Sequence, residues 1–149
     1  MDSKTNLESI VTKLGVFDIE ASMNQSNPEI KVKCDQLIEI AHALKDDQCY
    51  EILLDVIAVD YLTFGKADWK TNTSTNTGYS RAVKPTIIPG IDDTFEDRFA
   101  VFYQLLSVST NQRLTVKVFA SASNPPTVPS IVDIWSSADW FEREAFDLM

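Results

Sequence analysis

The residues of this sequence that could take part in acid–base chemistry begin with two aspartates inside one apolar run. Asp55 and Asp60 lie within residues 50–62, and carboxylates buried among apolar residues are candidates for functional sites. Side chains alternate between the two faces of a strand, so the odd separation of these aspartates places them on opposite faces. They therefore cannot form the facing carboxylate pair of a glycosidase. We expect both to be structural, with Asp60 ordering the loop that follows the strand.

The single histidine, His42, could act as a general base. No nucleophile or orienting acid stands near it at a recognisable spacing, and a catalytic triad cannot be inferred from residues scattered through a chain. We expect a surface histidine. A small stand-alone hydrolase that uses His42 and the terminal acids stays open as an alternative.

The glycines and cysteines exclude several standard cofactor sites. The four glycines form neither GxGxxG nor GxxxxGK[ST], which excludes binding of NAD, FAD or ATP through such a loop. Cys34 and Cys49 are too few for a disulfide framework or for a zinc or Fe–S site. We expect two structural thiols and assign no catalytic, cofactor-binding or metal-binding residue.

The last ten residues, 140–149, are rich in both aromatic and charged side chains. Arg143 lies four residues from Asp139 and four from Asp147, the spacing at which side chains meet on a helix. One arginine could therefore bridge two acids along one face. On physical grounds this face is equally a solvated surface, with ion pairs of about 0.3–0.5 kcal/mol each, or a protein contact.

A second face of the same helix is predicted to be apolar and to pack on a sheet. Trp135, Trp140 and Phe146 fall outside that stripe, and surplus aromatics near an arginine are enriched in protein contact surfaces. The stripe comprises Ile131, Ile134, Ala138, Phe141, Ala145 and Leu148.

The apolar periodicity predicts the elements that must position these residues. Apolar residues at helical spacing predict helices over 6–14 and 34–45. Apolar residues on both faces of 50–62 predict a central strand that is covered on each side, at least in part. Further strands are predicted at 16–21, 29–33, 98–109 and 113–121, the last two joined as a hairpin.

The end of the chain is predicted to form the last helix. Residues 124–129 are a stiff, proline-rich spacer, and Ser130 stands at capping-box distance from Asp133. Either serine of the pair at 136–137 could break this helix by capping a second start at Ala138.

Residues 63–96 separate the long strand from the hairpin. Their Thr-rich part, 71–78, has no apolar period, so we expect a long exposed insertion. Loops of this length often make contacts. An acidic adaptor that binds a partner through the Thr-rich loop therefore stays open as a further alternative.

The predicted order is α-β-β-α-β-(long loop)-β-β-α, an α+β two-layer sandwich with helices on one face of a mixed β-sheet. A length of 149 residues predicts one domain, 1–149. The formal charge of −9 argues against nucleic acid as a partner. No run reaches the roughly 20 apolar residues of a membrane span, and the polar N-terminus is not a secretory signal. We therefore expect a cytoplasmic protein.

Several ordered blocks of the chain resemble one protein family. The most specific is the run Trp140-Phe141-Glu142-Arg143-Glu144, followed by Asp147-Leu148. From about residue 30 onward, the chain is similar to the 30 kDa subunit family of the proton-pumping NADH:quinone oxidoreductase (respiratory complex I), in its proteobacterial form. The other matching blocks are 58–66, 78–81, 98–107, 111–118 and 128–135.

The resemblance implies a non-catalytic subunit of the peripheral arm, on the cytoplasmic side of the bacterial inner membrane. Such a subunit packs against the 49 kDa subunit near the quinone-reducing end. It supports electron transfer from NADH to quinone through FMN and Fe–S clusters that partner subunits bind. The residues implied at the partner interface are Trp140, Glu142, Arg143, Glu144 and Asp147. Family members continue past the Asp-Leu pair, so the resemblance also implies a C-terminally truncated chain.

Overall fold

The computed structural model describes residues 3–24, 27–62, 64, 97–121 and 123–148. The predicted insertion at 63–96 lies outside the described residues apart from Phe64. In the described ranges the elements follow the predicted order, with a short 3₁₀ helix (η1) added before the second helix. They are α1 (Ser3–Lys13), β1 (Glu20–Asn24), β2 (Asn27–Val32), η1 (Cys34–Gln36), α2 (Leu37–Asp46), β3 (Ile52–Asp60), β4 (Phe99–Ser107), β5 (Gln112–Phe119) and α3 (Ala138–Leu148).

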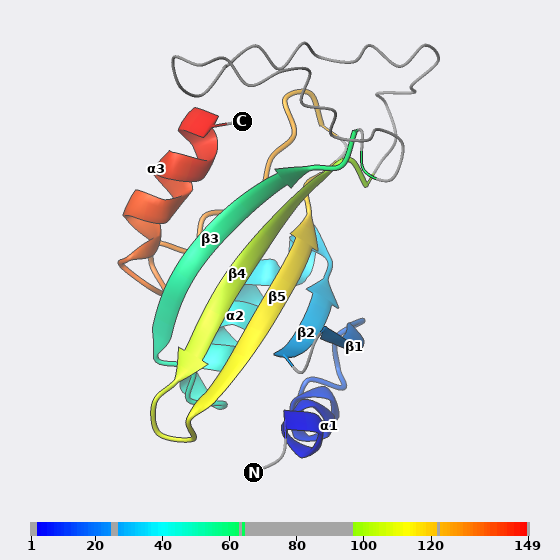
Figure 1. The fold of residues 1–149 in the computed structure, drawn as a ribbon, viewed down its shortest axis with the longest axis vertical. Helices are drawn as coiled ribbons and strands as arrows, with labels where there is room; N and C mark the ends of the chain where they lie inside the picture. The colour runs from blue at the N-terminus through cyan, green and yellow to red at the C-terminus, as the bar shows by residue number, and fades with distance from the viewer. Residues whose placement is uncertain (1–2, 25–26, 63, 65–96, 122, 149) are drawn as a thin grey trace, which may run out of the picture.

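The five strands form one mixed sheet in the order β1-β2-β5-β4-β3. Neighbouring strands run antiparallel, except that β2 and β5 are parallel. Figure 1 shows α2 lying behind this sheet and α3 standing beside β3. The predicted α+β class with a mixed sheet is confirmed.

The core fills the space between the helices and one face of the sheet, which we call the inner face. One row of cross-strand neighbours on it comprises Ile30, Val116, Tyr103 and Val56, and all four are buried. The two amphipathic helices α1 and α2 cover the inner face because their apolar residues recur at helical spacing. The buried apolar residues are Leu7 and Ile10 in α1, Leu14 directly after it, and Leu37, Ile40, Ala41 and Leu44 in α2.

The prediction of a central strand in the long apolar run is wrong, because β3 lies at the edge of the sheet. A β-bulge between Leu53 and Asp55 shifts the alternation of side chains, and Leu53 faces the core. Ile52 and Ile57 point to the opposite face and remain 41% and 43% exposed. The apolar residues of β3 therefore lie on two different faces, one buried in the core and one that the described residues leave exposed.

The last helix begins later than the Ser130–Asp133 spacing predicts. Residues 131–137 form turns, and α3 starts at Ala138, the second predicted start. Ser130 caps no helix there: its hydroxyl accepts a hydrogen bond from the Val132 amide at 3.3 Å in the first turn and donates one to the Glu142 carboxylate.

The prediction that Trp135 stands outside the packed stripe is also wrong. Its side chain is only 5% exposed, and its indole Nε1 donates to the Tyr50 carbonyl oxygen at 3.1 Å. The turns before α3 break the helical period, so Trp135 packs in the core with Ile131 and Ile134. A buried indole needs such an acceptor, since an unpaired polar group in the core is costly.

The Trp135 hydrogen bond predicts a stability difference between two identical substitutions. Trp135→Phe leaves the Tyr50 carbonyl without its donor and should lower the free energy of unfolding by about 1–3 kcal/mol. Trp140→Phe is the matched control, because this exposed side chain should change stability by less than about 0.5 kcal/mol. Urea unfolding of both variants measures the difference, and equal losses would contradict the assignment.

Candidate protein interface

The solvent-facing side of α3 carries four of the five predicted interface residues. Trp140 lies three residues before Arg143 and four before Glu144, and Asp147 lies four after Arg143 and three after Glu144, the spacings that place side chains on one helix face. All four are exposed, Trp140 by 73%. Ala138, on the opposite face of α3, is fully buried against the core. The four residues therefore form one solvent-facing group.

Arg143 organises this face. Its Nε lies 3.3 Å from an Asp139 carboxylate oxygen, and its guanidinium carbon lies 5.7 Å from the centroid of the Trp140 ring. The predicted second pair, with Asp147, is not among the ion pairs of the described part of the chain. A cation–π contact at an exposed site contributes about 0.5–1 kcal/mol, which favours one orientation of the indole.

Glu142 differs from the other four because its carboxylate is hydrogen-bonded to the segment that precedes α3. Its Oε2 accepts a hydrogen bond from the Ser130 hydroxyl at 2.5 Å, and its Oε1 accepts one from the Ile131 amide at 2.8 Å. These bonds join α3 to the segment that leads into it. Glu142 thus positions the helix, while its contact with a partner stays a prediction.

An apolar groove of about 480 Å³ lies between α3, the inner face of β3 and β4, and the proline-rich segment before α3. Phe146 lines the groove, yet 84% of it is exposed. Burial raises the pKa of Tyr103 in the groove wall, and the nearby charge of Glu142 raises it further, so the phenol stays protonated. Together the groove and the exposed face of α3 give an apolar centre with a charged rim, the composition of a protein interface.

Among the described residues, no catalytic partner lies at His42. His42 is exposed on α2, and its ion pair is with Asp46, Nδ1 to Oδ2 at 3.7 Å, one helical turn away. The prediction of a surface histidine is confirmed.

The two aspartates of β3 have structural roles, as predicted. Asp60 accepts hydrogen bonds from Nε and Nη2 of Arg98 at 3.0 and 2.9 Å, and from the Leu62 amide at 2.9 Å. It therefore orders the end of β3, and the bonds from Arg98 lower its pKa. Asp55 faces outward beside Gln104 and accepts a hydrogen bond from the Val56 amide at 2.9 Å.

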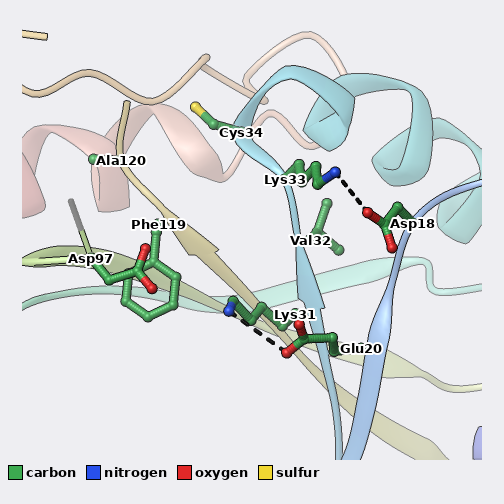
Figure 2. Close-up of a pocket in the computed structure, with 9 residues that line it drawn as sticks. All are labelled: Asp18, Glu20, Lys31, Val32, Lys33, Cys34, Asp97, Phe119 and Ala120. Atoms are coloured by element: carbon green, nitrogen blue, oxygen red, sulfur yellow. Dashed lines mark ion pairs between the residues drawn. The ribbon is translucent and has the colours of Figure 1, made fainter. Parts of the chain in front are cut away.

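A second hollow, of about 420 Å³, lies where β2 and β5 separate, and Figure 2 shows its charged lining. Its two lysines are already paired, Lys31 with Glu20 at 3.6 Å and Lys33 with Asp18 at 2.6 Å. Burial raises the pKa of the Cys34 thiol in its wall, which keeps the thiol protonated and poorly nucleophilic. The hollow therefore presents no activated nucleophile.

Two further kinds of feature are missing from the described residues. No three His, Cys, Asp or Glu side chains gather there as ligands for a metal ion. No helix among them has the length and apolar character needed to cross a membrane.

The Glu142 hydrogen bonds predict a specific effect on the start of α3. Glu142→Ala should lower the free energy of unfolding by about 1.5–3 kcal/mol, the range for hydrogen bonds to a charged group, and should speed exchange of the Ile131 amide. Glu144→Ala removes the same group from the exposed face and should leave both quantities nearly unchanged. Hydrogen exchange and urea unfolding test this, and identical behaviour of the two variants would refute the positioning role.

The Asp60–Arg98 pair predicts a pH-dependent contribution to stability. Because its pKa is lower in the folded state than in the unfolded chain, the carboxylate stabilises the fold fully above about pH 4 and loses this effect as the pH falls through the folded pKa. Asp60→Asn should therefore melt below the wild type at about pH 7, with the two midpoints converging at about pH 2. A gap that stays constant over this range would contradict the assignment.

Comparison with known proteins agrees with the resemblance in the sequence. Residues 30–149 match the family described as respiratory-chain NADH dehydrogenase, 30 Kd subunit. The NADH-quinone oxidoreductase subunit designated C of Coxiella burnetii (strain Dugway 5J108-111) is 48% identical over 114 residues, which cover 75% of this chain and 50% of the relative. Its counterpart from Vesicomyosocius okutanii subsp. Calyptogena okutanii (strain HA) is 40% identical over 148 residues, covering 99% of this chain and 68% of the relative.

The chain thus spans 50% of the length of the Coxiella relative. Among solved structures, a chain from the membrane-bound sulfane sulfur reductase (MBS), an archaeal respiratory membrane complex, matches with a TM-score of 0.65 at 17% identity. That match covers 100% of this chain and 68% of the other, and it shows a shared fold. Because the family match takes in most of the sequence, the chain belongs to the family of the 30 kDa subunit of respiratory-chain NADH dehydrogenase.

Proposed function

We propose that this chain is a non-catalytic structural subunit of the peripheral arm of a proton-translocating NADH:quinone oxidoreductase. In this proposal FMN and the Fe–S clusters belong to partner subunits, and electrons pass through them from NADH to quinone. Family membership supports the proposal, as do the relatives named as NADH-quinone oxidoreductase subunits. The chain would act on the cytoplasmic side of the bacterial inner membrane.

The observation that carries the proposal is the unpartnered aromatic surface of α3. Trp140, Phe146 and Leu148 are 73%, 84% and 77% exposed, which is a large exposed apolar surface for one short helix. Trp and Arg dominate the energetics of protein interfaces, and Arg143 already holds a position beside Trp140. Covering this surface with another subunit would remove that apolar area from water.

The partner proposed for this surface is the 49 kDa subunit, near the quinone-reducing end. Around Arg143, the exposed face of α3 carries the carboxylates of Asp139, Glu144 and Asp147. A complementary partner would present an apolar pocket for Trp140 and basic groups opposite these acids, since matched potentials fix the register of an interface. The hydrolase alternative gains no support, because the exposed His42 pairs with Asp46 and with no catalytic acid among the described residues.

The proposal predicts that removing the Arg143 side chain weakens assembly without unfolding the protein. Arg143→Ala, produced in the protein's own cells, should lower the amount of assembled complex several-fold, because Trp140 loses its neighbour and the acids lose their counter-charge. Trp140→Ala should act in the same direction.

Native gels and co-purification measure the complex, and thermal unfolding of the purified variants checks their fold. Lys13→Ala, which removes an exposed cation from the end of α1, is the control and should assemble normally. Normal amounts of assembled complex with both Arg143→Ala and Trp140→Ala would contradict the proposed interface.

A further inference from the structure

The face of the sheet opposite the helices carries an uncovered patch of aromatic and apolar residues. Ile57 on β3, Phe102 on β4 and Lys117 on β5 are cross-strand neighbours in one row of this outer face. Phe119 follows on β5, and its ring centroid lies 6.1 Å from that of Tyr61. We call these five residues the outer patch. It lies across the sheet from the core and from α3.

The apolar members of the outer patch are partly exposed, since Ile57 is exposed and the rings of Tyr61, Phe102 and Phe119 are half-buried. Ile57 is 43% exposed, and Ile52 and Leu54, further along β3, are 41% and 38% exposed. Contiguous apolar surface of this kind on a soluble domain marks an interaction site.

Lys117 stands among the rings of the outer patch. Its Nζ lies 4.7 Å from the ring centroid of Phe119, 4.9 Å from that of Tyr61 and 5.3 Å from that of Phe102. None of the ion pairs of the described residues gives this ammonium group a carboxylate. Cation–π attraction to the rings holds the ammonium group in place, but no carboxylate among the described residues pairs with it.

A second lysine adds to the positive charge at this point. Lys31 on β2 is the cross-strand neighbour of Lys117, and its Nζ lies 5.2 Å from the ring centroid of Phe119. Like charges directly opposite each other destabilise a sheet, and of the two lysines only Lys31 has a described acid, Glu20 at 3.6 Å. Figure 2 shows Lys31 and Phe119 at the hollow between β2 and β5, so the patch borders a space open to further side chains.

The charge of Lys117 determines what can cover the outer patch. A partner that packs on Ile57 and Phe102 must also remove water from Lys117. Burying an unpaired ammonium group is costly, so the covering surface has to supply an anion. An anionic lipid surface is disfavoured, because its negative charge is spread over the whole contact and would also lie against Glu29 and Asp55 in the neighbouring row, whereas a single carboxylate can lie at Lys117 alone.

We propose that the outer patch is a second docking site, for a protein segment in which an Asp or Glu is flanked by apolar residues. The carboxylate pairs with Lys117, and the flanking apolar side chains pack on Ile57 and Phe102. The site is separate from the α3 interface of the proposed function and does not depend on it. The protein would then be held from both sides of its sheet.

Site-specific cross-linking in the protein's own cells tests this second site. The photoreactive amino acid p-benzoylphenylalanine replaces Ile57 in one variant and Trp140 in another, and the cross-linked peptides are sequenced. The Ile57 variant should link to a protein other than this chain, within a few residues of an Asp or Glu. The Trp140 variant reports separately on the α3 interface, so either surface can fail while the other stands.

Charge variants at Lys117 make the cross-linking test quantitative. Lys117→Glu should lower the Ile57 cross-link yield by about tenfold or more, because like charges across an interface are strongly unfavourable. Lys117→Met keeps the apolar stem and should lower the yield less. Lys13→Glu, the same charge change on exposed α1, should leave the yield unchanged. Thermal unfolding shows whether each purified variant keeps its fold.

Four outcomes of the cross-linking test would overturn the proposal. They are the absence of any Ile57 cross-link, a link to a second copy of this chain, a linked peptide without a nearby acid, and an unchanged yield in a folded Lys117→Glu variant. Binding of the purified protein to phosphatidylglycerol vesicles that is lost in Lys117→Glu would also overturn it, in favour of a lipid contact.

Discussion

Burial of only one face of the sheet is the constraint on which the rest of this structure depends. The inner row from Ile30 to Val56 is sealed by α1 and α2, and these helices leave the far end of β3 and β4 to be covered by α3. α3 reaches the core through Ala138 and Phe141 near its start. Its later residues stand away from the sheet, which leaves the apolar groove beneath Phe146. The groove and the exposed aromatics are therefore two consequences of the same incomplete cover.

Features set by local periodicity could be predicted from the sequence, whereas features set by distant contacts could not. The stripe of α2 and the alternation of β5 are repeated patterns, and Asn111, at a φ of 52°, supplies the left-handed residue of the predicted hairpin. The bulge at Leu54 leaves no such signal, because one added residue among apolar neighbours looks like continued strand. The resemblance implied five interface residues on the last helix, four of which share the exposed face of α3, but the hydrogen bonds that Glu142 accepts from Ser130 and Ile131 join residues 12 and 11 positions apart outside any repeat.

The two exposed surfaces differ in chemistry. The face of α3 is acidic around one arginine, while the outer patch is aromatic around Lys117, for which the described residues supply no ion-pair partner. A chain with a formal charge of −9 thus keeps a positive centre on the side of the sheet away from its acidic helix. Because matched charges fix the register of an interface, the two surfaces would select partners of different chemistry.

The bulge in β3 has a consequence for the behaviour of the free chain. An edge strand presents unpaired N–H and C=O groups that can template the addition of a foreign strand, and exposed isoleucines make such addition more favourable. By offsetting the ladder at Leu54, the bulge interrupts the regular spacing that an incoming strand would need. The bulge, which made the two faces of β3 hard to identify from the sequence, thus disfavours aggregation of the free chain through this edge strand.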